Sequence, residues 1–279
     1  MRNFRIILSV LFVLLASFFV VRACVHKKPF YREIKKPAPV VKKRIVYEKA
    51  GPPPSEKVSE GPRMAIILDD WGNNFSLVKV AVDLHRPITL SILPHLIHSE
   101  QIDAEASKDG LGIMLHMPMQ PKNKTRGLEP HTIKITNTDQ EIVTYLDGAL
   151  VSVPHAEGVN NHMGSEATAD LRVMRVVLSH LAAKGLFFID SNTTSLTVGP
   201  QVAKEVNIRF TKRDVFIDND LNPESIKRYL KRAETIALKR GRVVVIGHDK
   251  RLTLDAIKAE IPEIEKAGIR LVLAKDLAE

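Results

Sequence analysis

Six side chains that could carry acid–base or metal-binding chemistry follow short apolar runs in this sequence. They are Asp69, Asp70, His116, His162, Asp190 and His248. The runs before them are apolar and mostly rich in β-branched or aromatic residues, which predicts buried strands. Because ligands and catalytic groups gather at the C-terminal ends of parallel strands, we expect these side chains to meet at one rim. Histidine is a poor helix-capping residue, so three histidines at strand ends favour a functional site.

These residue types support hydrolysis at a single divalent metal ion. Two neutral imidazoles and one carboxylate, with one position left for water, make a hydrolytic zinc site. One carboxylate of the Asp69–Asp70 pair can bind the ion while the other acts as general base, since adjacent side chains diverge. His248, from a different strand, is placed to donate a proton to the leaving group. The alternative, that the two aspartates only cap a helix beginning near Phe75, stays open here.

Composition limits the other kinds of site. The chain has one cysteine, Cys24, which excludes an internal disulfide framework and a thiolate metal cluster. Residues 1–63 carry 14 lysines and arginines against 4 acidic residues, whereas residues 64–279 carry 27 against 28. Residues 1–63 therefore carry a net charge of +10 and residues 64–279 a net charge of −1, so the positive charge of the chain lies in residues 1–63. Since nucleic-acid binding needs basic charge on a folded face, no nucleic-acid partner is expected.

Residues 1–25 are expected to be a signal or membrane-anchor segment. Ile6 to Val21 is apolar except for two serines and follows two arginines, a pattern typical of secretory signals and signal-anchors. Lysines directly after the segment favour the opposite membrane orientation. We nevertheless expect export, with the protein periplasmic or otherwise extracytoplasmic, and anchored at the inner membrane or secreted after cleavage. Residues 26–63 contain seven prolines and many lysines, which predicts a disordered basic linker suited to an anionic envelope surface.

Strands and helices alternate through residues 64–279. The predicted strands are Met64–Leu68, Ile88–Leu93, Gly112–His116, Gly158–Asn160, Leu186–Asp190, Ile208–Phe210, Val243–Gly247 and Ile269–Ala274. Segments with helical spacing between them include Phe75–Leu84, Asp139–Leu150, Ala169–Lys184, Pro223–Lys239 and Leu254–Ala267. This rhythm predicts an α/β domain with seven or eight parallel strands in a closed or slightly incomplete (β/α) barrel, with an open doubly wound sheet as the alternative.

Several motifs of this domain resemble those of the divergent polysaccharide deacetylases, distant relatives of the NodB-type carbohydrate esterases. The motifs are Ile67-Leu68-Asp69-Asp70, Leu115–Pro121, Gly158–Ser165, Phe188–Ser191, Arg213–Asp218 and Ile246-Gly247-His248. They occur in the family's order, and the similarity covers essentially all of residues 64–279.

The resemblance implies a deformed (β/α) barrel and one divalent metal ion, expected to be zinc. Matched by position, the implied metal ligands are Asp70, His116 and His162. The implied general base is Asp69 and the implied acid is His248. Asp190 would orient a neighbouring group or contact the substrate.

The expected activity is removal of acetyl groups from a cell-envelope polysaccharide or other amino-sugar polymer. Two alternatives stay open. One is a non-catalytic envelope protein that binds or positions a partner on the same fold. The other is a hydrolase of a different ester or of a phosphoester, which would use the same residues. The sequence leaves open the oligomeric state and the cleavage or lipidation of the N-terminal segment.

Overall fold

The computed structural model describes residues 61–123 and 127–279. The expected signal or anchor at residues 1–25, and nearly all of the expected linker at residues 26–63, lie outside the described residues. No helix in the described ranges is long and apolar enough to cross a membrane.

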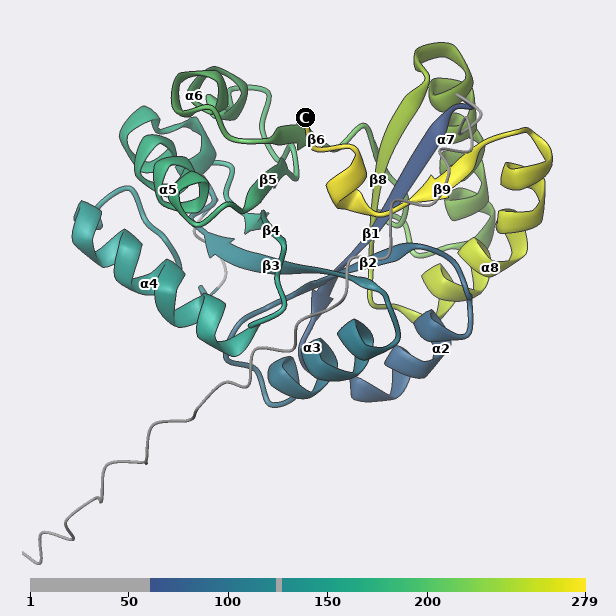
Figure 1. The fold of residues 1–279 in the computed structure, drawn as a ribbon, viewed down its shortest axis with the longest axis horizontal. Helices are drawn as coiled ribbons and strands as arrows, with labels where there is room; N and C mark the ends of the chain where they lie inside the picture. The colour runs from purple at the N-terminus through teal and green to yellow at the C-terminus, as the bar shows by residue number, and fades with distance from the viewer. Residues whose placement is uncertain (1–60, 124–126) are drawn as a thin grey trace, which may run out of the picture. The chain divides into compact units, whose positions relative to one another are not determined.

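The described strands form one parallel sheet that curls into a half-barrel (Figure 1). The nine strands are β1 (Arg63–Trp71), β2 (Ile88–Ile92), β3 (Gly112–Met119), β4 (Gly158–Met163), β5 (Phe187–Asp190), β6 (Phe210–Lys212), β7 (Val215–Phe216), β8 (Arg242–His248) and β9 (Arg270–Val272). Eight follow one another across the sheet in the order β6-β5-β4-β3-β2-β1-β8-β7, and β9 pairs with β1. The α/β fold with eight parallel strands in a deformed barrel is therefore confirmed.

The two edges of this sheet are joined by the chain itself. The edge strands β6 and β7 are consecutive, with only Arg213 and Asp214 between them. The Arg213 amide donates to the Asp190 carbonyl of β5, and the Asp214 amide donates to the Val244 carbonyl of β8. Within the described residues no strand pairing links β6 to β7. A covalent link thus spans the seam where a regular barrel would have a hydrogen-bonded ladder.

Helices surround the outer side of the sheet (Figure 1). They are α2 (Val78–Val82), α3 (Ser99–Lys108), α4 (Asp139–Ser152), α5 (Leu171–Ala183), α6 (Gly199–Val206), α7 (Pro223–Arg240) and α8 (Arg251–Lys266). Local signals fix their ends. Thr138 and Glu141 form a capping box at the start of α4. Asn222 caps α7, and Gly241 ends that helix in the left-handed conformation.

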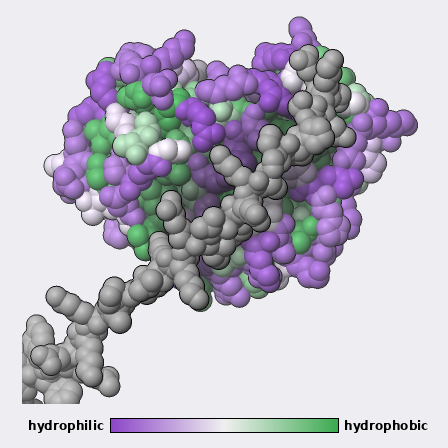
Figure 2. All heavy atoms as spheres, viewed as in Figure 1, coloured by the Kyte–Doolittle hydropathy of each residue, from purple (hydrophilic) through white to green (hydrophobic). Residues whose placement is uncertain are grey.

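Strand alternation divides the buried apolar side chains into two clusters. Met64, Ile66 and Leu68 of β1 belong to the larger cluster, which also contains the buried faces of the helices. Ala65 and Ile67 belong to a smaller cluster with alternate residues of the other strands and with Leu277 near the C-terminus. The smaller cluster therefore fills the concave side of the sheet. Apolar residues appear only as patches among hydrophilic ones on the face in Figure 2, as expected when the large apolar side chains fill these two cores.

The sequence predicted the positions of eight of the nine described strands and missed one. Each of the eight predicted runs overlaps an observed strand, with ends shifted by a few residues. The missed strand, β7, has only two residues, which is too short for an alternation pattern. Helices α3 and α6 were not among the predicted segments. The sequence of α3, SEQIDAEASK, has few apolar residues, so its buried face is narrow.

Replacing Leu277 with alanine should destabilise the domain, because its fully buried side chain fills the concave side of the sheet. We expect the free energy of unfolding to fall by about 2–5 kcal/mol, as for other buried leucines. Urea denaturation measures the change. Leu238→Ala is the matched control, since Leu238 is 56% exposed on α7 and should change stability by less than about 0.5 kcal/mol. Equal effects of the two substitutions would contradict the assignment of Leu277 to a core.

Candidate metal centre

The two adjacent aspartates reach the same space because β1 departs from regular strand geometry. In a regular strand, Asp69 and Asp70 would point to opposite faces. The pairing of β1 with β2 shifts register between Leu68 and Trp71, and Asp70 has a φ of 66°, in the left-handed region. This conformation is uncommon for residues other than glycine, although aspartate is among those that adopt it most readily. The left-handed backbone conformation at Asp70 turns its carboxylate to the side of the sheet on which the Asp69 carboxylate lies.

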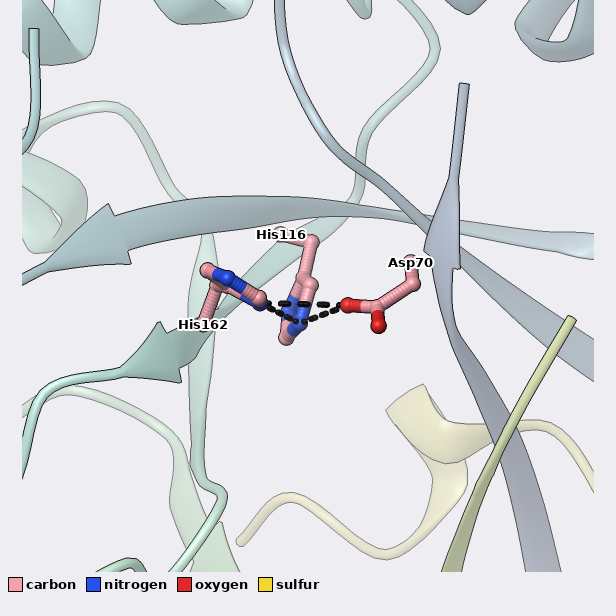
Figure 3. Close-up of side chains that lie close together, drawn as sticks. All are labelled: Asp70, His116 and His162. Atoms are coloured by element: carbon pink, nitrogen blue, oxygen red, sulfur yellow. Dashed lines mark hydrogen bonds and ion pairs between the residues drawn. The ribbon is translucent and has the colours of Figure 1, made fainter. Parts of the chain in front are cut away.

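Asp70, His116 and His162 converge at this point (Figure 3). Asp70 Oδ1 lies 3.3 Å from His116 Nε2 and 3.1 Å from His162 Nδ1. The two histidine nitrogens are 3.2 Å apart. The histidines lie 46 residues apart in the chain, but β3 and β4 are neighbours, and His116 pairs with Asn160 while Pro118 pairs with His162. Both rings therefore project from the same face of adjacent strands.

The spacing of the three donor atoms fits a tetrahedral zinc ion. With metal–ligand bonds of about 2.0–2.1 Å, the corners of a tetrahedron lie about 3.3 Å apart. The three measured separations are 3.1, 3.2 and 3.3 Å. Within the described residues, these three side chains make up the group of His, Cys and acidic residues that could hold an ion. The ligand set predicted from the sequence is thus brought together, with Asp70 in the triad and Asp69 beside it.

Asn160 fixes the roles of two residues at once. Its Nδ2 donates to Asp69 Oδ1 at 2.9 Å, so its Oδ1 is left to accept. His116 Nδ1 lies 2.8 Å from that oxygen and must carry the proton, which leaves the lone pair of Nε2 facing the metal position. In the sequence, Asn160 stands out only as part of the motif Gly158–Ser165, because nothing in the chain marks its contact with a residue 91 positions away.

The two aspartates differ in acidity. Burial raises the pKa of Asp69, and attraction to His116 and the bond from Asn160 offset only part of this effect. Burial also acts to raise the pKa of Asp70, but in the metal-free protein the attraction of the neighbouring His116 and His162 rings outweighs burial and holds the pKa of Asp70 well below the usual range. An ionised Asp70 suits a metal ligand. A carboxylate with a raised pKa, such as Asp69, suits proton transfer.

His248 is held by a buried aspartate, Asp218. The His248 amide donates to Asp218 Oδ2 at 2.7 Å, and the ring Nδ1 lies 3.0 Å from Asp218 Oδ1. Thr253 donates to the same carboxylate. Burial acts to lower the pKa of His248, but the hydrogen bond and charge of Asp218 raise it to about 9. The opposite ring nitrogen, Nε2, lies 3.8 Å from Asp70 Oδ2, so a protonated His248 adjoins the metal position.

Asp190 lies at the end of β5 but is bound locally. One carboxylate oxygen accepts from the Asn192 amide at 2.7 Å, and the other accepts from the Thr197 hydroxyl at 2.6 Å. These bonds shape the loop after β5, and the carboxylate makes no described contact with the triad. The partly buried guanidinium of Arg213 is attracted to both Asp69 and Asp190. The catalytic role of Asp190 stays a prediction.

A family model described as divergent polysaccharide deacetylase matches residues 66–278. The chain belongs to the divergent polysaccharide deacetylase family. The resemblance in the sequence motifs is thereby confirmed, over nearly the whole described domain.

Relatives of this family member occur in several bacteria. It is 30% identical over 215 residues to the uncharacterised protein YibQ of Escherichia coli (strain K12), covering 77% of this chain and 67% of YibQ. It is 32% identical over 210 residues to an uncharacterised protein of Haemophilus influenzae, covering 75% and 74% of the two chains. The crystal structure of an uncharacterised protein from Agrobacterium tumefaciens is similar, with a TM-score of 0.74 and 22% identity over 78% of this chain and 89% of that one. This last likeness shows a shared fold.

Replacing Asp218 with asparagine should lower the pKa of His248 in the metal-free protein. The pKa should fall from about 9 towards the ordinary imidazole value of about 6.5, because the charge that stabilises the imidazolium is removed. NMR titration of the ring protons measures the change.

The same pair makes stability depend on pH. The pKa of His248 is raised in the folded protein, so the ion pair stabilises the fold fully below about pH 6.5, and this stabilisation is lost as the pH rises through about 9. The parent protein should therefore exceed Asp218→Asn in unfolding free energy at about pH 6.5, and this difference should shrink as the pH is raised to about 9. An unchanged His248 pKa in the variant would contradict the pairing.

Proposed function

We propose that this family member is a metal-dependent hydrolase that removes acetyl groups from a carbohydrate polymer of the cell envelope. The observation that carries the proposal is the triangle of donor atoms from Asp70, His116 and His162, whose sides of 3.1–3.3 Å match a tetrahedral zinc site. Asp69, the proposed base, and His248, the proposed acid, flank this triangle, and the pKa of each is raised above its ordinary value. Perturbed pKa values cluster at catalytic sites.

The residues divide the chemistry between them. An ion held by the triad would polarise the acetyl carbonyl and promote loss of a proton from water. Asp69, oriented by Asn160, accepts the proton of the attacking water. His248, held by Asp218, donates a proton to the amine or hydroxyl that leaves the acetyl carbon. Acetate and the free amino or hydroxyl group are the products, and the two protonation states are restored by exchange with solvent.

The substrate and location belong to the same proposal. The apolar segment at residues 6–21 and the basic, proline-rich stretch at residues 26–63 support a tether that holds the domain outside the cytoplasm. An enzyme tethered there would meet polymers of the envelope. The family to which the chain belongs supports an acetylated polysaccharide, and an N-acetylated amino-sugar polymer is the substrate that we propose.

Replacing Asp69 with asparagine should abolish turnover while the metal stays bound. Loss of a general base costs about 10²–10⁴-fold in rate, and Asp69 is not one of the three ligands. Acetate release from an acetylated amino-sugar oligomer and zinc content of the purified protein measure the two effects. His116→Ala should instead lose the zinc, because it removes a ligand. Asp83→Asn, at an exposed position after α2, is the control and should change neither.

The outcomes separate the competing functions. Acetate release by Asp69→Asn at the parent rate would rule out Asp69 as the base. A parent protein that binds zinc and the oligomer but releases no acetate would favour the non-catalytic binding protein. Zinc-dependent release of a different group would favour the hydrolase of another ester.

A further inference from the structure

The two ring nitrogens of His162 face different groups. Its Nδ1 lies 3.1 Å from Asp70 Oδ1 and 3.2 Å from His116 Nε2. Its Nε2 is buried without a hydrogen bond in this structure and lies 3.3 Å from Glu129 Oε1, within ion-pair distance. The two nitrogens of an imidazole point in different directions, so Glu129 stands behind the ring and outside the triangle of donor atoms. Glu129 was not among the candidates from the sequence, because it lies in a loop without strand or helix periodicity.

Glu129 is held in place by a structured loop. The backbone amide and the hydroxyl of Thr132 both donate to the Glu129 carbonyl, at 3.2 and 2.6 Å. One residue further, the Ile133 amide donates to the Pro118 carbonyl, and the Gln120 amide donates to the Ile133 carbonyl. These bonds attach the loop to the end of β3, the strand that carries His116. The position of Glu129 is thus coupled to the strand of the other histidine.

Aromatic contacts attach the same loop to α4. The His131 ring stacks on Tyr145 with centroids 5.1 Å apart and an interplanar angle of 27°. His95 meets His131 edge-on at 5.7 Å. Arg172 of α5 donates to two carbonyls further along the loop, those of Ile135 and Asn137. Contacts with β3, α4 and α5 therefore hold the part of the loop that follows Glu129, which keeps the Glu129 carboxylate close to His162.

We propose that Glu129 is a positioning residue for the metal centre, which accepts the Nε2 proton of His162 and so presents the Nδ1 lone pair to the ion. A neutral imidazole carries one proton, and the group that binds it decides which nitrogen can be a ligand. Metal-binding histidines commonly donate their second N–H to a carboxylate or carbonyl.

His116 and His162 then bind the ion in opposite tautomers. Asn160 holds the proton of His116 on Nδ1, so that Nε2 is the ligand. With the ion bound, Glu129, 3.3 Å from Nε2, would hold the proton of His162 on that nitrogen, so that Nδ1 is the ligand. This inference rests on the metal site of the proposed function and adds a fourth side chain that the ligand set depends on.

Zinc affinity of the full-length protein tests this role directly. Competition with a chromophoric chelator measures the dissociation constant for zinc in the parent protein, Glu129→Ala and Glu129→Gln. We expect Glu129→Ala to bind zinc about 10–100-fold more weakly, the range found for such partners. Glu129→Gln keeps an acceptor oxygen without the charge, so its affinity should lie between the two. Glu100→Ala, at an exposed position in the first turn of α3, is the matched control and should bind zinc like the parent.

Melting temperatures of the metal-free proteins separate positioning from packing. We expect all four proteins to melt within about 2 °C of one another without metal, because Glu129 is partly exposed. Parent-like affinity in Glu129→Ala would overturn the inference. A drop in its metal-free melting temperature, with parent-like affinity in Glu129→Gln, would also overturn it and assign Glu129 to loop packing.

The same data separate this inference from the proposed function. A parent protein without zinc binding would overturn both. Zinc binding without acetate release would contradict the activity alone, and the order of the zinc affinities would still decide the role of Glu129.

Discussion

At Asp70 the backbone of β1 enters the left-handed region, with a φ of 66°, and the pairing with β2 shifts register. Without this break, the Asp70 carboxylate would point to the outer face of the sheet, among the helices. Asp69 and Asp70 could not then both face the metal position. The inward row of β1 already leads from Ala65 and Ile67 to Asp69, so the break adds a second carboxylate to that row. The metal triangle depends on this conformation.

Polar partners surround the triangle. Asn160 donates a hydrogen bond to Asp69 and accepts one from His116, and the Asp218 carboxylate is hydrogen-bonded to His248. The Glu129 carboxylate lies at ion-pair distance from the outer nitrogen of His162. Each partner comes from a different element than the residue it holds. Because the partners are buried or partly buried, their charges are screened less than at the surface. The site is therefore preorganised by neighbouring strands and one loop, which is what acid–base catalysis requires.

Much of this molecule could be predicted from its sequence, and the limits have physical causes. Strand rhythm located eight strands, and polar residues at their ends located Asp70, His116 and His162 on one rim. The break at Asp70 was not foreseen, since aspartate rarely signals a left-handed residue as glycine does. Asp218 and Glu129 were not assigned because their contacts span 30 and 33 residues of chain. Only the folded sheet shows which residues lie opposite one another.

The position of a bound zinc ion tests the central claim most directly. A crystal of the protein grown with stoichiometric zinc would be measured at the zinc absorption edge for anomalous scattering. We predict one strong anomalous peak about 2.0–2.1 Å from Asp70 Oδ1, His116 Nε2 and His162 Nδ1. No peak at this point, or a zinc ion bound by other residues, would contradict a metal site at this triad.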